Sequence, residues 1–544
     1  MVRPRRRRPT AAIPSRRPRR VRRRRPSRAL SSPANRRLPP GRPPRPPALS
    51  TGPGGSQRRR VLHRYLPLPG PQPAGIFPLV RGIPVSRPNI LVVLTDQLRR
   101  QALSCHGDPD ARTPHINALS QAGATFDQAC STYPICVPFR FTFMTGHYAH
   151  TRLVPGIEWR MAPTERTLAD EFNEAGYETV YVGKWHLDGG HGRMGSAVQC
   201  NRTPIPRPHQ GRWQKWFGFE LRNGPFDTCY FEDDDPTPIT LDGYQTDGLF
   251  DIAMDYLRDG RDPTSPFCLV LSVEPPHPPY EAPPELEKAW KERDLQLPAN
   301  FAPADQQQRQ NWITQRQIYH AMVENLDDNV GRLRAFLSEQ NLADDTIVVF
   351  LSDHGELGGA HGLNGKQHPF EESVGIPLIV CDPRHPERAG TRLTDPTSTE
   401  DLFPTLLGLA GLTGRDDLPG TDLTSLIHGE TDQLDRPGVL LEFVAELRPN
   451  LPYYDAVWRG FRSPRYKYTV KGDKHGAAPW QFFDLEEDPT ESNNLIDSAP
   501  GHPEIARHHA WLQQRMAATL DPLPLLPAFD QPGYNLPTNP PVKE

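Results

Sequence analysis

The sequence predicts an α/β fold in which a large, mostly parallel sheet is covered by helices and followed by a small antiparallel C-terminal subdomain. Several short runs are apolar and β-branched without polar alternation, which is typical of strands buried on both faces. Segments with helical periodicity separate these runs, as expected for right-handed crossover connections. After residue 437, short strand-like pieces follow one another with only turns between them, which favours antiparallel pairing.

The predicted elements can be placed in chain order. Those of the large domain are a strand over 88–96, helices over 115–122 and 168–175, strands over 177–183 and 267–273, a long helix over 315–339, strands over 346–351 and 378–380, and a helix around 401–412. The strand-like pieces of the subdomain are 438–443, 454–459, 466–470 and 481–484. Residues 199–240 are rich in Pro, Trp and charge, and we expect this long excursion to be a substrate-facing lid.

Composition divides the chain into four parts: a leader (1–86), the α/β domain (87–420), the subdomain (437–520) and a proline-rich tail (521–544). The leader contains 23 Arg and no Asp, Glu or Lys, so we predict that it is disordered. It either contacts nucleic acid or an anionic membrane, or is a dispensable tail. The remaining 458 residues hold 40 basic and 65 acidic side chains, a net charge of −25.

Several protein classes are excluded by composition. The seven cysteines are odd in number, widely spaced and without a Cys-x-x-Cys pair, which argues against a disulfide framework and a structural zinc site. No apolar run reaches the ~20 residues of a membrane span, and the leader lacks the apolar stretch of a secretory signal. We therefore expect a cytoplasmic protein with no membrane contact, whose folded body does not bind nucleic acid.

Two predicted strands end in polar residues that suit a metal. Asp96 and Gln97 follow the first strand, and Asp353 and His354 follow the strand over 346–351. Ligands of open α/β sheets bind at the carboxyl ends of strands, so these four side chains can meet despite their separation in sequence. Three oxygen donors and an imidazole suit Ca²⁺, Mg²⁺ or Mn²⁺. The alternative is that each Asp merely caps the next helix.

The segment Cys136-Val137-Pro138-Phe139-Arg140 resembles the Cys-x-Pro-x-Arg signature of the type I, formylglycine-dependent sulfatases of the alkaline phosphatase superfamily. The strand-end pairs resemble the acidic pair and the Asp-Asn or Asp-His pair of that family. Further matching motifs follow in the family's order over residues 88–500: Gly-Lys-Trp-His at 183–186, Pro-His-x-Pro-Tyr at 276–280, and Lys366 after Asp-His-Gly.

The resemblance implies a large mixed, mostly parallel sheet sandwiched by helices, and hydrolysis of a sulfate monoester. A separate formylglycine-generating enzyme would oxidise Cys136 to formylglycine, whose hydrate attacks sulfur. One divalent cation is implied, Ca²⁺ ahead of Mn²⁺ or Mg²⁺. Its ligands would be Asp96, Gln97, the modified Cys136, Asp353 and His354. The substrate would be a small carbohydrate, aryl or alkyl sulfate.

The same resemblance implies roles for the other site residues. Pro138 suits the first turn of a helix, which would place residue 136 at a helix N-terminus that favours an anion. Arg140 would steady the hydrated aldehyde, and Lys184 and Lys366 would bind the sulfuryl oxygens. His277 would be the general acid, and His186 would hydrogen-bond the diol or the ester oxygen. The alternatives are surface lysines and structural histidines.

Gln97 departs from the commoner second aspartate of the family. The same Asp-Gln variant occurs in choline sulfatases and phosphonate monoester hydrolases, so a phosphodiesterase or phosphonate monoester hydrolase using the same site remains an alternative. An arginine-rich nucleic-acid-binding protein with an inert sulfatase-like body is an alternative of another class.

Overall fold

The computed structural model describes residues 87–523, except for 153, 155, 158, 191–201, 222–223, 445–456 and 474–475. The predicted leader and most of the predicted tail lie outside these residues, as does Cys200. The chain separates into two units, 1–80 and 81–544, and only the second is described below. The six cysteines within the described ranges are all free thiols.

A ten-stranded mixed sheet forms the centre of the α/β domain, which confirms the predicted fold class. Strands β9, β1, β8, β4 and β5 are neighbours and run parallel, whereas β10 pairs antiparallel with β9. In spatial order the strands are β11 (Thr391–Leu393), β2 (Ala124–Phe126), β10 (Leu378–Cys381), β9 (Thr346–Ser352), β1 (Asn89–Thr95), β8 (Phe267–Val273), β4 (Glu178–Lys184), β5 (Lys215–Phe219), β6 (Cys229–Glu232) and β7 (Ile239–Thr240).

The central strand β1 is buried along its whole length because both faces of the sheet are covered. Ile90 and Val92 pack into one hydrophobic cluster, and Leu91 and Val93 pack into another on the opposite face. This division follows from the two-residue period of a strand, and it explains why the sequence of β1 shows no polar alternation.

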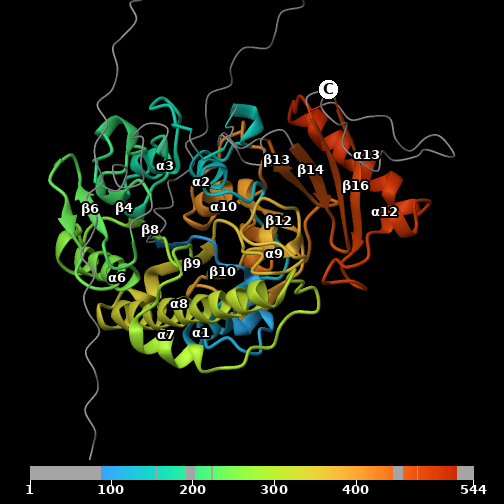
Figure 1. The fold of residues 1–544 in the computed structure, drawn as a ribbon. Helices are drawn as coiled ribbons and strands as arrows, with labels where there is room; N and C mark the ends of the chain where they lie inside the picture. The colour runs from blue at the N-terminus through green and yellow to red at the C-terminus, as the bar shows by residue number, and fades with distance from the viewer. Residues whose placement is uncertain are drawn as a thin grey trace, which may run out of the picture. The chain divides into compact units, whose positions relative to one another are not determined.

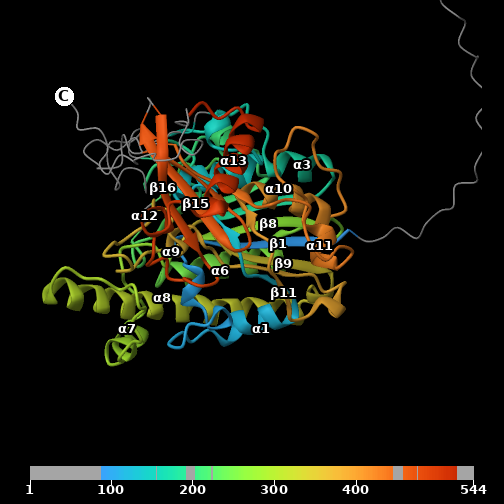
Figure 2. The ribbon, with the colours of Figure 1, turned by 90° about the vertical axis from the view of Figure 1, so that its right-hand side faces the viewer.

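Helices cover the two faces, as Figures 1 and 2 show from two sides: α1, α7 and α8 lie on one side of β1, β8 and β9, and α10 lies on the other. The helices of this domain are α1 (Pro114–Ala122), α2 (Cys136–Thr145), α3 (Leu168–Glu174), α6 (Gln245–Asp255), α7 (Pro284–Lys291), α8 (Gln306–Glu339), α9 (Glu371–Val374), α10 (Thr399–Leu409) and α11 (Thr424–His428). A two-stranded ladder joins β3 (Ala129–Cys130) to β12 (Thr397–Ser398).

The small C-terminal subdomain is a four-stranded antiparallel sheet, as the sequence predicts. Phe461, Tyr468 and Val470 of this sheet pack with Leu512 and Met516 in one hydrophobic cluster. The elements are β13 (Val439–Phe443), β14 (Val457–Arg462), β15 (Tyr466–Asp473), β16 (Gly476–Asp484), α12 (Leu495–Ser498) and α13 (Pro503–Ala518).

Two expectations differ from the structure. The excursion over 199–240 is not a loop throughout its length, because β5, β6 and β7 extend the edge of the sheet and Trp216 is fully buried, and a substrate-facing role for it stays a prediction. Helix α8 begins at Gln306, nine residues before the predicted start, where the carboxylate of Asp305 accepts a hydrogen bond from the Gln308 N–H. Such a cap stabilises a helix start that side-chain periodicity alone does not reveal. None of the described helices is both long enough and apolar enough to cross a bilayer.

Candidate active site

Four neighbouring strands deliver polar side chains to the same edge of the sheet. The register pairs Thr95 of β1 with Ser352 of β9 and with Val273 of β8, so the strands end level with one another. The residues that follow or end them are Asp353 and His354 (β9), Asp96 and Gln97 (β1), Glu274 and His277 (β8), and Lys184 and His186 (β4). Level ends of parallel strands are where open α/β sheets bind ligands.

Cys136 is the first residue of α2, and Ile135 is the N-cap. Its Sγ lies 3.2 Å from His354 Nε2, 3.3 Å from Lys366 Nζ and 3.6 Å from Asp96 Oδ1. All ten residues of α2 are buried, so the helix presents its N-terminus to the strand ends from inside the protein. The free N–H groups of that terminus favour a developing negative charge at residue 136.

Asp96, Cys136, Asp353 and His354 offer ligand atoms that all lie within 4.8 Å of one another. The donors fit a divalent cation. His354 Nδ1 lies 3.1 Å from the Gly355 carbonyl, a contact that places the ring proton on Nδ1 and leaves Nε2 free to bind a metal. Gln97 joins this cluster through its N–H, which donates to Asp353 Oδ1 at 3.0 Å.

The two buried carboxylates have opposite pKa shifts. Burial is the largest single influence on Asp96 and works against its ionised form, but the positive charges around it, Lys184 first, together hold the pKa well below the usual range. Burial, and next the charge of Asp96, raises the pKa of Asp353 to about 7. The raised pKa of Asp353 means that the positive side chains around the pair do not fully offset burial and the repulsion from Asp96, which is a second reason why the cluster suits a divalent ion.

Arg140 lies beneath both carboxylates. Its Nη2 is 3.3 Å from Asp96 Oδ2 and 3.3 Å from Asp353 Oδ2, and its Nη1 donates to the Lys184 carbonyl and to Ser272 Oγ. The guanidinium therefore holds the carboxylates of two strands in place. Its hydrogen bonds in the described part of the chain go to these groups rather than to the side chain of Cys136.

The two predicted lysines lie beside this cluster. Lys184 Nζ is 2.8 Å from Asp96 Oδ2 and 3.1 Å from Glu274 Oε1. Lys366 Nζ is 3.3 Å from Cys136 Sγ and donates to Gln97 Oε1 at 2.8 Å. Neither is the solvated surface lysine of the alternative interpretation: Lys184 is buried and Lys366 is partly buried.

The two predicted histidines make few hydrogen bonds with the described residues. His186 is buried in a left-handed backbone conformation, φ 57°, and neither ring nitrogen has a hydrogen-bond partner among the described residues. His277 Nδ1 lies 2.6 Å from the Pro278 carbonyl, which directs Nε2 away from the backbone. Burial, and next a nearby lysine (Lys184 for His186, Lys366 for His277), lowers both pKa values well below 6.5.

Sequence reasoning missed two carboxylates that orient the predicted residues. Glu274 contacts Lys184, as given above. Glu356 accepts hydrogen bonds from the Gln97 side-chain amide, from Tyr280 Oη and from the backbone N–H of Gly365. The only signal in the sequence was the position of each carboxylate within five residues of a strand end.

Comparison with known proteins supports the family expectation. The chain matches the family model described as Sulfatase over residues 88–412, and the model described as N-sulphoglucosamine sulphohydrolase, C-terminal, over residues 359–519. It is 32% identical over 427 residues to an ulvan-active sulfatase of Formosa agariphila, covering 77% of this chain and 78% of that protein. It is 28% identical to a choline-sulfatase of Rhizobium meliloti, covering 79% of this chain and 86% of that protein.

Solved structures share the fold. The putative sulfatase yidJ from Bacteroides fragilis matches with a TM-score of 0.72 and 26% identity, over 80% of this chain and 97% of that chain. The phosphonate monoester hydrolase of Agrobacterium radiobacter matches with a TM-score of 0.64 and 22% identity, over 80% of this chain and 96% of that chain. At that identity the second likeness concerns the fold alone.

Proposed function

Because the chain belongs to the sulfatase family and is a sulfuric ester hydrolase, we propose that it cleaves a sulfate monoester with a formylglycine made from Cys136 and a divalent cation. The observation that carries this proposal is the position of Cys136 Sγ, at a helix N-terminus and within 3.6 Å of an aspartate, a histidine and a lysine. A separate formylglycine-generating enzyme is the partner that this modification requires.

Asp96, Gln97, Asp353 and His354 would hold the cation together with residue 136. Their oxygen-rich donor set favours Ca²⁺, with Mn²⁺ or Mg²⁺ as alternatives. When bound, the cation and the hydrated aldehyde would supply an acidified hydroxyl nucleophile. Arg140 keeps the two carboxylates aimed at the cation, because its guanidinium bridges them from below.

Lys184 and Lys366 would bind the sulfuryl oxygens of the substrate. Each ammonium group already stands within 3.3 Å of a group of the cluster, so little reorganisation is needed when charge develops on the transferred group. Preorganised charges in a buried site stabilise such a transition state far more than charges in water do. Glu274 would keep Lys184 protonated and in position.

His277 would hold the proton for the leaving oxygen, since its Nε2 points away from the backbone contact made by Nδ1. The negative charge of a bound sulfate ester would raise its pKa and favour the protonated ring. His186, whose ring nitrogens have no partner among the described residues, would hydrogen-bond the diol or the ester oxygen.

A sulfated carbohydrate is the substrate class that we propose. The relatives include the ulvan-active sulfatase and an N-acetylglucosamine-6-O-sulfatase of Bacteroides thetaiotaomicron, which is 24% identical over 518 residues.

Gln97 supports a second candidate, hydrolysis of a phosphodiester or phosphonate monoester at the same site. Its amide replaces a carboxylate and so removes one negative charge from the cation site. Its Oε1 accepts a hydrogen bond from Lys366 while its Nε2 donates to Glu356. Turnover of an aryl sulfate, a phosphate diester and a phosphonate monoester by one preparation, side by side, decides between the two.

Mass spectrometry of the peptide that carries residue 136 tests the proposal directly. After co-expression with a formylglycine-generating enzyme, the thiol should be replaced by an aldehyde, and sulfatase activity should follow the aldehyde content. Cys136→Ala should be inactive. Finding only intact cysteine, together with full activity of Cys136→Ala, would contradict the mechanism.

A further inference from the structure

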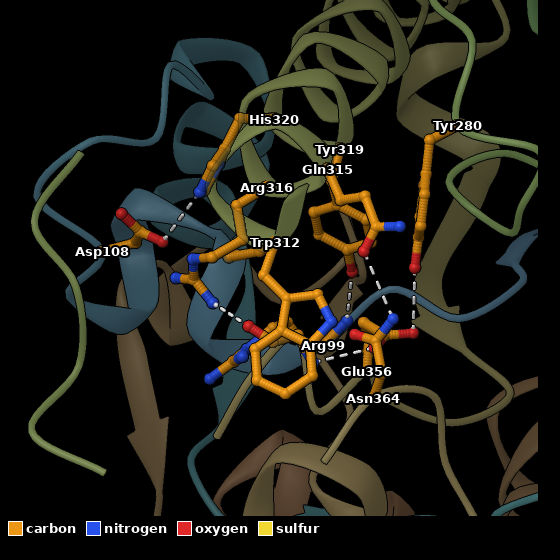
Figure 3. Close-up of a pocket in the computed structure, with 12 residues that line it drawn as sticks. Arg99, Asp108, Tyr280, Trp312, Gln315, Arg316, Tyr319, His320, Glu356 and Asn364 are labelled. Carbon is orange, nitrogen blue, oxygen red and sulfur yellow. Dashed lines mark hydrogen bonds and ion pairs between the residues drawn. The ribbon is translucent and has the colours of Figure 1, made fainter. Parts of the chain in front are cut away.

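The side chain of Glu356, in the loop that follows β9, is buried and surrounded by hydrogen-bond donors. Its Oε1 accepts from the backbone N–H groups of Gly358 at 2.8 Å and Gly365 at 2.7 Å. Its Oε2 accepts from Tyr280 Oη at 3.2 Å (Figure 3) and from the side-chain amide of Gln97. A carboxylate has about four lone-pair positions, so these four donors occupy all of them.

The side-chain amide of Gln97 lies between two groups of opposite hydrogen-bonding character. Its Nε2 donates to Glu356, and its Oε1 accepts from Lys366 Nζ at 2.8 Å. An ammonium group can only donate and the carboxylate here only accepts, so the amide has one favourable orientation. Turning it over would place Nε2 against the ammonium and Oε1 against the carboxylate. The amide oxygen therefore faces Lys366, whose Nζ also contacts Cys136 Sγ at 3.3 Å.

The backbone of Gln97 is held in place independently of its side chain. Its φ is 66°, a left-handed conformation that few residues other than glycine adopt unless the surroundings impose it. The Gln97 N–H donates to Asp353 Oδ1 at 3.0 Å, and the Gln97 carbonyl accepts from Tyr319 Oη at 2.7 Å. Because the backbone is fixed on both sides, the partners of the amide decide where its oxygen lies.

These contacts also restrict which side chain fits at position 97. A carboxylate there would meet Glu356 with acceptor facing acceptor in a buried place, which leaves both without a donor and sets like charges together. The amide instead supplies the donor that Glu356 accepts, and it carries no charge. The carboxylates of the cation cluster itself are then Asp96 and Asp353, and the negative charge of Glu356 lies on the far side of the amide.

We propose that Glu356 is the positioning residue that fixes the Gln97 side chain as an amide whose oxygen faces the cation. Glu356 acts through Gln97 and contacts neither the cation nor the substrate. It thereby sets the charge of the cation site, because it excludes a third carboxylate from the ligands. This inference rests on the proposed function, since it needs a cation held by Asp96, Gln97, Asp353 and His354.

Exchanging the two side chains tests this role. In Gln97→Glu, two carboxylates face each other. In Glu356→Gln, the new amide cannot accept from donors on both of its sides, so at least one buried donor loses its partner. The double variant Gln97→Glu/Glu356→Gln restores the match, because the amide at position 356 donates to the carboxylate at position 97. It still accepts from the N–H groups of Gly358 and Gly365.

The affinity for Ca²⁺, measured by isothermal titration calorimetry, is the main readout, and the Tm in chelator is the second. Glu356→Gln should weaken Ca²⁺ binding by about 10–100-fold, the usual effect of losing a residue that orients a metal ligand. The double variant should bind Ca²⁺ at least as tightly as the unsubstituted protein, because a carboxylate replaces an amide at the cation. Gln97→Glu alone should lower the Tm in chelator, and adding Glu356→Gln should restore it. Glu285→Gln, at an exposed glutamate on α7, is the control and should change neither readout.

A purely structural role would give a different pattern. If Glu356→Gln lowered the Tm but left the Ca²⁺ affinity unchanged, Glu356 would only stabilise its loop and the inference would be wrong. A double variant that recovers neither the affinity nor the Tm would also overturn it, and in both cases the sulfatase function would stand. If the aldehyde-bearing unsubstituted protein bound none of Ca²⁺, Mn²⁺ and Mg²⁺, the cation of the proposed function would be refuted, and this inference with it.

Discussion

The ammonium group of Lys366 lies 3.3 Å from Cys136 Sγ, although the two residues are 230 positions apart in the chain. A backbone hydrogen bond between Leu357 N–H and the Gly365 carbonyl closes the loop that carries the lysine, and Glu356 accepts from Gly365 N–H within the same loop. The loop therefore presents a fixed positive charge to the reacting centre.

Replacing Lys366 should lower the rate strongly. We expect Lys366→Ala to reduce kcat/KM for an aryl sulfate by about 10²–10³-fold, because a preorganised charge beside the transferred group is lost. The aldehyde content of residue 136 must be measured in parallel, so that a failure of maturation is not mistaken for a loss of catalysis. Lys288→Ala on the exposed face of α7 is the control. An unchanged kcat/KM at full aldehyde content would rule out the assigned role.

Removing the metal should lower both activity and stability. Chelation leaves Asp96 and Asp353 with only the positive charges of Arg140 and Lys184 beside them and removes a ligand that binds the folded state, so we expect the Tm to fall by about 5 °C or more and to recover when Ca²⁺ is added back. Asp353→Asn should weaken the effect of the chelator on the Tm, because it removes one negative charge from the cation site and with it the repulsion from Asp96. Calorimetry with and without chelator measures the shift, and an identical Tm in the two conditions would argue against a cation at this cluster.

Gly183 is the residue that lets β4 approach β8 just before Lys184. Its φ is +99°, and a Cβ there would lie 2.0 Å from the Ser272 carbonyl oxygen. We expect Gly183→Ala to lower the free energy of unfolding by about 3 kcal/mol or more, through both strain and overlap. Gly176→Ala is a matched control, with φ +79° and no atom within 4 Å of the added carbon, and should cost only about 1 kcal/mol. Equal losses in urea denaturation would show that the contact with β8 is unimportant.

The buried pair His150 and Glu442 should make stability depend on pH. Burial lowers the pKa of His150, but the charge and hydrogen bond of Glu442, with the charge of Asp521, together raise the pKa above the usual 6.5. A raised pKa means that the folded state binds the proton more tightly than the unfolded state. The stabilisation is therefore complete below pH 6.5 and is lost as the pH rises through the folded-state pKa.

Substitution of either partner checks this dependence. The difference in Tm between the unsubstituted protein and His150→Gln should be larger at pH 6 than at pH 9, and Glu442→Gln should abolish the same pH-dependent part. A difference that stays constant over this range would mean that the histidine is neutral in the folded protein throughout.

Much of the fold could be predicted because it depends on local patterns. The apolar run of β1 and the position of Pro138 each specify an element without reference to the rest of the chain, and the structure has both where the sequence predicts them. The strands within 199–240 were not predicted, because they are short and add to an edge of the sheet. Pairing at an edge depends on backbone hydrogen bonds, which any sequence can make.

In the candidate site too, residues that belong to a local pattern were predicted, and a residue defined by distant contacts was not. Asp96, Asp353, Lys184 and Lys366 were predicted because each follows a recognisable strand or motif. Glu356 was missed because its importance lies in its partners, Gln97 and Tyr280, which are distant in sequence.

The sequence by itself determined which segments become strands, which side chains stand at their carboxyl ends, and that Cys136 begins a helix. Only the tertiary structure decided that β9, β1, β8 and β4 lie side by side, which gathers those side chains around Cys136. The physical reason is that local chain composition governs the formation of an element, whereas its neighbours are selected by packing and hydrogen bonding between segments that are far apart along the chain.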